Sequence, residues 1–130
     1  MSDFIEVFPE ALSAGHCRQI IDRFEASPHV TVGQVGSGVD KTMKDSRDLT
    51  ISRYPEWQDV EQLLNNTMML GLCAYLRKYP HLLLAPLAIG VRDPATGGSR
   101  RLTAEEFPGM TDEQLVPFVR YAFRPGAINV

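Results

Sequence analysis

The stretch WQDVEQLLNNTMMLGLCAYLRKY, residues 57–79, carries the strongest secondary-structure signal in the chain. Its apolar and aromatic positions recur at helical spacing and share one side of a helix: Trp57, Val60, Leu64, Met68, Gly71, Tyr75 and Tyr79. Pro55 suits the first turn of such a helix, and Pro80 would end it. Residues 68–76 are apolar nearly all round. We therefore predict one long helix that is buried on more than one side in its second half.

A second amphipathic helix is predicted nearer the N-terminus. Ser13 is a typical N-cap, and Pro28 marks the end of the helix. Residues 3–8 predict a short strand that Pro9 stops, with Phe4 and Glu6 on one side and Ile5 and Val7 on the other. The apolar face of the helix consists of Cys17, Ile20, Ile21 and Phe24.

Short extended segments and turns account for the rest of the chain. Residues 93–101 predict a polar loop. Thr103 and Thr111 each open a capping box, and the second should begin a short helix that Pro117 stops or bends. Extended segments are predicted at Val30–Val32, Asp48–Ser52, Leu82–Val91 and Ala127–Val130.

Composition indicates a globular protein with a single domain over residues 1–130. Hydrophobic residues make up 44% and charged residues 22%, and the net charge is −3. This balance predicts no nucleic-acid partner and no anionic membrane partner. The longest apolar run is far shorter than the roughly 20 residues of a membrane helix, and no secretory signal is present, so we expect a cytoplasmic location. Cys17 and Cys73 are interpreted as buried free thiols on apolar helix faces.

A search for chemistry finds no complete site. His16, His29 and His81 are scattered and lack the spacing of metal ligands. Glycines at 33–38 and 97–98 depart from the phosphate-binding patterns, and we interpret both stretches as solvated turns. No catalytic, cofactor-binding or metal-binding residue is therefore predicted.

One polar stretch has two interpretations. Residues 41–48, KTMKDSRD, follow a loop containing Gly33, Gly36 and Gly38 and precede a predicted strand. They form either a solvated hairpin arm or a flap whose cations meet an anionic or polar partner. In the second interpretation the substrate-proximal residues are Lys41, Lys44, Ser46 and Arg47.

The order of these features resembles the N-terminal region of 2-oxoglutarate/Fe(II)-dependent oxygenases of the prolyl-4-hydroxylase-like group. Residues 4–13, FIEVFPEALS, with Cys17–Ile21 resemble the first strand and helix of that group. Lys44-Asp45-Ser46 is similar to its basic-x-Ser element, and residues 57–79 resemble its scaffold helix. Phe123–Val130 resembles the approach to the strand that precedes the H-x-D/E iron motif.

The resemblance implies an α+β fold in which support helices pack on part of a double-stranded β-helix, or jelly-roll, sheet. It also implies that the iron motif, a distal histidine and the basic residue that holds 2-oxoglutarate all lie after Val130. Fe(II) and 2-oxoglutarate would then be cofactors of a longer parent protein, a hydroxylase. Residues 1–130 alone would bind neither and would be inactive.

A different class of function stays open at this point. The same helices and flap could form a stand-alone, non-enzymatic binding or structural module that contacts a protein partner. In either case the substrate or partner is a protein or a small molecule. An incomplete sheet would expose unpaired strand edges, so we also expect the chain to form homodimers through them.

Overall fold

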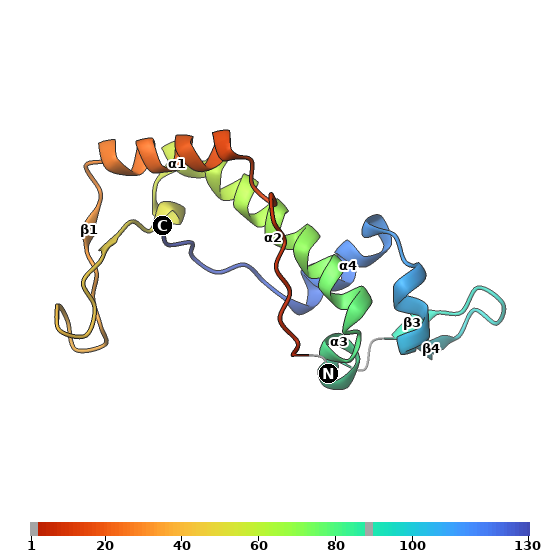
Figure 1. The fold of residues 1–130 in the computed structure, drawn as a ribbon. Helices are drawn as coiled ribbons and strands as arrows, with labels where there is room; N and C mark the ends of the chain where they lie inside the picture. The colour runs from red at the N-terminus through yellow and green to blue at the C-terminus, as the bar shows by residue number, and fades with distance from the viewer. Residues whose placement is uncertain (1–2, 88–89) are drawn as a thin grey trace. The chain divides into compact units, whose positions relative to one another are not determined.

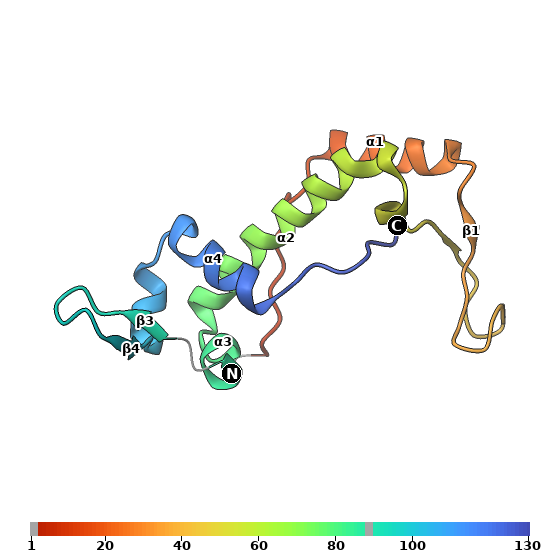
Figure 2. The ribbon, with the colours of Figure 1, turned by 180° about the vertical axis from the view of Figure 1, so that it is seen from behind.

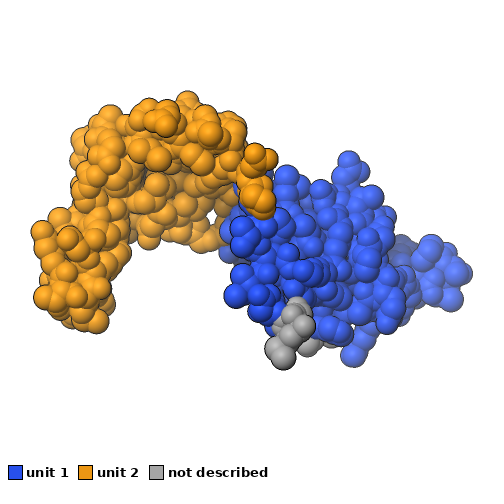
Figure 3. All heavy atoms as spheres, in the orientation of Figure 1, with its two compact units in different colours: residues 1–8, 66–124 blue, residues 9–65, 125–130 orange. Residues whose placement is uncertain are grey.

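The structure, a computed structural model, describes residues 3–87 and 90–130 and has an α+β fold (Figures 1 and 2). Contacts divide the chain into two compact units, which Figure 3 colours separately. Unit 1 contains residues 1–8 and 66–124, and unit 2 contains residues 9–65 and 125–130. The α-helices are α1 (Ala14–Ala26), α2 (Gln58–Lys78), α3 (His81–Leu87) and α4 (Asp112–Ala122). The 3-10 helices are η1 (Ile51–Arg53), η2 (Pro55–Trp57) and η3 (Ala104–Gly109).

The sheets in the described residues are two short antiparallel pairs. In unit 2, β1 (Thr31–Val32) pairs with β2 (Arg47–Asp48), with Thr31 opposite Asp48. In unit 1, β3 (Gly90–Arg92) pairs with β4 (Ser99–Arg101), with Val91 opposite Arg100.

Helix α2 confirms the predicted long helix. Pro55 opens η2, which leads directly into α2, and the helix ends at Lys78, just before Tyr79 and Pro80. The first part of α2 buries Val60 in the core of unit 2. The later part buries Cys73 and Leu76 in the core of unit 1. Cys73 and Leu76 share one face of the helix, whereas Met68 and Leu70 are 50% and 53% exposed, so this half is not buried all round.

Helix α1 begins and ends as predicted. The Ser13 hydroxyl accepts a hydrogen bond of 3.1 Å from the His16 backbone N–H, which satisfies one of the free donors at the helix start. Ile20 is the buried residue of this helix. The prediction that Cys17 is buried is wrong, because α1 buries a narrow face around Ile20 and leaves Cys17 exposed. The prediction for Cys73 is confirmed, and burial raises the pKa of its thiol.

The chain after β2 pairs with residues 128–130. Leu49 and Val130 exchange two backbone hydrogen bonds of 2.9 Å, and the Ile51 N–H donates to the Ile128 carbonyl at 2.9 Å. The extended segments predicted at Asp48–Ser52 and Ala127–Val130 are thus confirmed in part. The first is shorter than predicted because the chain turns into η1 at Ile51, and this turn buries the Ile51 side chain.

Helix α4 continues through a proline. Its Thr111 capping box is present, but Pro117 does not stop this helix, because α4 runs to Ala122. A proline inside a helix costs about 3 kcal/mol. Leu115 and Val119, on either side of Pro117, are both fully buried, and each contributes about 1.5–3 kcal/mol by burial. The burial of Leu115 and Val119 together offsets the free-energy cost of Pro117 in the helix.

Residues 82–91 differ from the extended segment that the sequence predicts. Residues 81–87 form α3 instead, with the Leu83 and Leu84 N–H groups donating to the Pro80 carbonyl. Leu83 is fully buried in the core of unit 1, which favours the helical turn. The end of the predicted segment is confirmed as β3, and residues 88–89 lie outside the described residues.

Residues 3–8 lie along the second half of α2 as an extended strap without a paired strand (Figures 1 and 2). The predicted alternation is present only in part: Phe4 and Glu6 contact residues of α2 or its C-terminal end, but Phe4 is 65% exposed, nearly as much as Ile5 at 69%. The predicted strand itself is wrong. Among the described residues no backbone group of 4–8 bonds to another strand. Side chains of α2 hold the strap instead.

The hairpin of β3 and β4 is tied to η3 by one carboxylate. Glu106 accepts two hydrogen bonds from the Arg100 guanidinium, at 3.0 and 2.5 Å, and one of 2.7 Å from the Thr103 N–H. The Thr103 capping box is therefore confirmed. The Arg100 guanidinium and the Thr103 N–H together lower the pKa of Glu106 from 4.5 to about 2.

We predict that Phe107→Ala lowers the free energy of unfolding by about 3–5 kcal/mol, because it removes a fully buried ring from the core of unit 1. Tyr121→Ala is the matched control, since that ring is 74% exposed and its loss should change the free energy by at most about 0.5 kcal/mol. Urea unfolding of both variants measures the difference. Equal losses would contradict the assignment of this core.

A pH titration of stability should detect the Glu106 contact. The folded-state pKa of Glu106 is depressed, so its contribution to stability is present above about pH 4.5 and is lost as the pH falls toward 2. Glu106→Gln should therefore flatten the decline in thermal stability between these pH values. Glu105→Gln, at an exposed neighbour that makes none of the bonds described above, should leave the decline as in the wild type. The same flattening in both variants would show that the contact between Glu106 and Arg100 is not the cause of the decline in stability.

Candidate functional site

The flap predicted from the sequence is an ordered hairpin in unit 2. Beyond β1, the Gly33 N–H donates to the Ser46 carbonyl at 2.8 Å, and Val35 and Gly38 exchange two hydrogen bonds that close a tight turn. Gly38 has φ 115°, a conformation that favours glycine. Asp40 accepts hydrogen bonds from the Thr42 backbone N–H at 3.0 Å and from its hydroxyl at 2.6 Å, which lower the pKa of Asp40. Local bonds thus define the conformation of the flap.

Two of the four predicted flap residues meet at one carboxylate. The Lys44 ammonium lies 2.5 Å from Asp48 Oδ2, and the Ser46 hydroxyl donates to Asp48 Oδ1 at 2.8 Å. Lys44 and Ser46 together lower the pKa of Asp48. This cluster packs directly on Gly33, where an added Cβ would lie 2.1 Å from the Ser46 hydroxyl and 3.0 Å from Lys44 Cε. A side chain at residue 33 would therefore force the Ser46 hydroxyl to move.

The other two predicted residues point to different surroundings. The Arg47 guanidinium lies 2.6 Å from the Glu25 carboxylate of α1 and over the Phe24 ring, 5.5 Å from its centroid. Glu25 raises the pKa of Arg47. Lys41 is exposed and makes no ion pair with any residue that the structure describes. The flap therefore offers one uncommitted cation, Lys41, because Lys44 and Arg47 are neutralised within unit 2.

The histidines have separate structural roles. The His16 backbone takes part in the cap of α1, and the His29 ring stacks on Tyr54 with Nε2 3.3 Å from a Glu56 carboxylate oxygen. His81 is the first residue of α3. Within residues 3–87 and 90–130, no three His, Cys, Asp or Glu side chains are grouped so that they could hold a metal ion.

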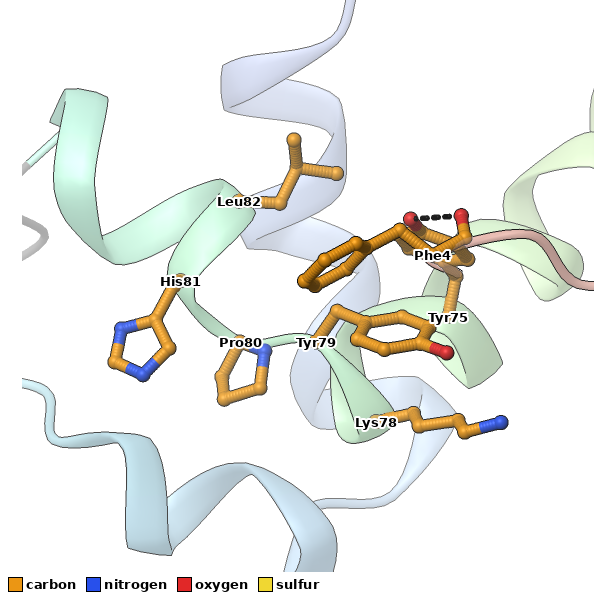
Figure 4. A pocket seen from close by; sticks show the side chains of 7 residues that line it. All are labelled: Phe4, Tyr75, Lys78, Tyr79, Pro80, His81 and Leu82. Carbon is orange, nitrogen blue, oxygen red and sulfur yellow. Dashed lines mark hydrogen bonds between the residues drawn. The ribbon is translucent and has the colours of Figure 1, made fainter. Parts of the chain in front are cut away.

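A pocket that the sequence did not predict lies in unit 1, where the strap meets the end of α2 (Figure 4). It has a volume of about 390 Å³, within the range of small-molecule sites. The Phe4 and Tyr79 ring centroids are 5.2 Å apart, and those of Tyr75 and Tyr79 are 4.7 Å apart. The residues that line the pocket are Phe4, Tyr75, Lys78, Tyr79, Pro80, His81 and Leu82.

Polar contacts hold the strap against this pocket. The Tyr75 hydroxyl donates to the Phe4 carbonyl at 2.7 Å, as the dashed line in Figure 4 marks. Glu6 accepts hydrogen bonds from the Lys78 ammonium and, at 3.0 Å, from the Tyr79 hydroxyl. Lys78 and Tyr79 lower the pKa of Glu6, and Glu6 raises the pKa of Lys78. Phe4 has φ 58°, which is uncommon for a residue other than glycine, and these contacts keep it there.

The sequence contains a signal for only one part of this pocket, the pair of tyrosines. Tyr75 and Tyr79 are four residues apart on the stripe of the long helix, so they share a face. Phe4 is 71 positions away from Tyr75, and no spacing rule relates the two residues. Tertiary contacts alone bring the third ring to the tyrosine pair.

No protein-family model, curated protein or solved structure matches this chain. None of the helices in the described part of the chain is long and apolar enough to cross a membrane.

We predict that Gly33→Ala destabilises unit 2 by about 1–3 kcal/mol, because the new methyl group must displace Ser46 and Lys44. Gly36→Ala is the matched control in the same loop, since a Cβ there would meet nothing within 4 Å. Chemical unfolding gives the free energies, and backbone amide shifts of 44–48 report the displacement. An equal effect of both substitutions would mean that glycine flexibility, rather than close packing, is what matters at residue 33.

Proposed function

We propose that this chain is the supporting N-terminal part of an iron/2-oxoglutarate-dependent oxygenase. In this proposal α1 and α2 are support helices, and the pairing of residues 49–51 with 128–130 belongs to a jelly-roll core that the parent protein completes. The iron and 2-oxoglutarate ligands would follow Val130. Residues 1–130 would act as scaffold and flap and carry no chemistry of their own.

The pairing of residues 49–51 with 128–130 supports this proposal most directly. Leu49 and Ile51 follow the Lys44-Asp45-Ser46 element, and they bond through backbone groups to Val130 and Ile128. Val130 is where the resemblance would place the approach to the iron motif. An extended, paired conformation here is what a strand leading into a metal site requires, because a sheet fixes ligand positions more rigidly than a loop.

The contacts within the flap narrow the choice of residues that would meet the substrate. Lys44 and Ser46 position the loop through Asp48, and Arg47 fixes it to α1 through Glu25. Lys41 is then the residue whose charge would meet an anionic or polar group on the substrate. The other three residues would act through the shape of the hairpin.

A non-enzymatic binding module is the competing function. Lys44 pairs with Asp48 and Arg47 pairs with Glu25, so ion pairs within unit 2 hold the flap. A flap held in this way would also offer a rigid surface to a protein partner, which favours the binding module. The reading frame beyond residue 130 discriminates the two functions. An H-x-D/E motif within some tens of residues, followed by a distal histidine and a basic residue, would support the oxygenase. A stop directly after Val130 would favour the module.

Binding experiments test the proposal on the protein itself. We expect residues 1–130 to give no saturable binding of Fe(II) or 2-oxoglutarate by anaerobic calorimetry, because their proposed ligands lie elsewhere. The longer product of the reading frame should bind both, and removal of Fe(II) with a chelator should stop its consumption of 2-oxoglutarate. A tight Fe(II) site within residues 1–130, or a longer product without iron-dependent turnover, would overturn the proposal.

A further inference from the structure

The pocket of unit 1 has the features of a ligand site that is independent of the proposed oxygenase function. We propose that it binds a small apolar monocarboxylate, whose apolar body lies on the rings of Phe4 and Tyr79 and whose carboxylate meets Lys78. The size of the pocket, its lining and its charge each support this assignment.

The lining selects an apolar body. The hydroxyl groups of both tyrosines are committed to the strap, Tyr75 to the Phe4 carbonyl and Tyr79 to the Glu6 carboxylate. The pocket is therefore lined by the carbon faces of the rings, with Pro80 and Leu82 completing an apolar wall. A polar body would lose its hydration without gaining hydrogen bonds on this wall, which is unfavourable.

The charge selects an anionic head. Lys78 and His81 are the basic residues of the lining, and no carboxylate is among the described residues that line the pocket. The ammonium of Lys78 has three donors, and the Glu6 carboxylate accepts from it. The Lys78 side chain is 60% exposed, so a further donor can reach a ligand at the edge of the pocket. A ligand carboxylate there would form a charge-assisted hydrogen bond.

A cationic ligand is disfavoured although aromatic rings attract cations. The Lys78 ammonium already lies over the Tyr79 ring, 5.3 Å from its centroid. A second cation in the pocket would be repelled by Lys78 at short range. The same rings would therefore accept an uncharged or anionic ligand in preference to an ammonium.

Three ligands that differ in one group test the assignment. We expect 3-phenylpropionate to bind more tightly than 3-phenylpropan-1-ol by about two- to fivefold, the effect of one partly exposed ion pair. The amine 3-phenylpropylamine should bind more weakly than the alcohol. Chemical-shift titration at pH 7.5 measures all three affinities, with the largest shifts at Tyr79 and Leu82. Equal or tighter binding of the amine, or no binding of any of the three at millimolar concentration, would overturn the proposal.

Substitutions at the ion pair separate a ligand contact from a structural role. Lys78→Gln should abolish the preference for the acid over the alcohol, and Lys78→Arg should restore it. Glu6→Gln should strengthen binding of the acid, because it removes a carboxylate that competes for Lys78 but keeps an acceptor for the Tyr79 hydroxyl. A purely structural ion pair would give the opposite result for Glu6→Gln, namely weaker binding of acid and alcohol alike, and that result would contradict the proposal.

Matched controls account for net charge and folding. Arg120→Gln removes a positive charge from the exposed side of α4 in the same unit and should leave the acid preference unchanged. Thermal unfolding of each variant shows whether unit 1 remains folded at the temperature of the titration. If Lys78→Gln is folded and still prefers the acid, Lys78 is not the contact and the proposal is wrong.

Discussion

Helix α2 has to bury apolar side chains in two different cores along its 21 residues. Val60 belongs to the core of unit 2, while Cys73 and Leu76 belong to the core of unit 1. In unit 1 the strap also lies along α2, and there a Cβ added at Gly71 would lie 3.6 Å from the Phe8 ring. This is an ordinary van der Waals distance, so the Phe8 ring would accommodate alanine at residue 71.

Ion pairs in this protein position segments and are not its main source of stability. Glu6, Asp48 and Glu106 each bind a cation and at least one further hydrogen-bond donor, and each has a lowered pKa. All three lie near the surface, where water and salt weaken an ion pair. Their common effect is geometric: they hold the strap, the flap and the β3–β4 hairpin, which have few backbone bonds to the helices.

Much of the helical structure could be predicted from local patterns. The periodicity of residues 57–79 indicated α2, Ser13 and Pro28 bounded α1, and the capping boxes at Thr103 and Thr111 marked the starts of η3 and α4. The errors arose where tertiary burial outweighs a local signal. Pro117 and Pro86 indicate breaks, yet buried Leu115 and Leu83 draw the chain into helices. At the flap, sequence located Lys41 to Arg47 but could not show that Asp48 and Glu25 neutralise two of the cations.

Each unit combines segments that are far apart in the sequence, and this affects how the chain folds during synthesis. The strap is synthesised before the tyrosines and the lysine that hold it, which come about 70 residues later. Likewise, the backbone hydrogen bonds between Leu49 and Val130 can form only after Val130 has been synthesised. Contacts of such large sequence separation close late and slow the search for the native state. Leu49, which is buried in the folded protein, therefore lacks part of its packing until residues 128–130 have been synthesised, and exposed apolar surface of this kind favours aggregation or chaperone binding.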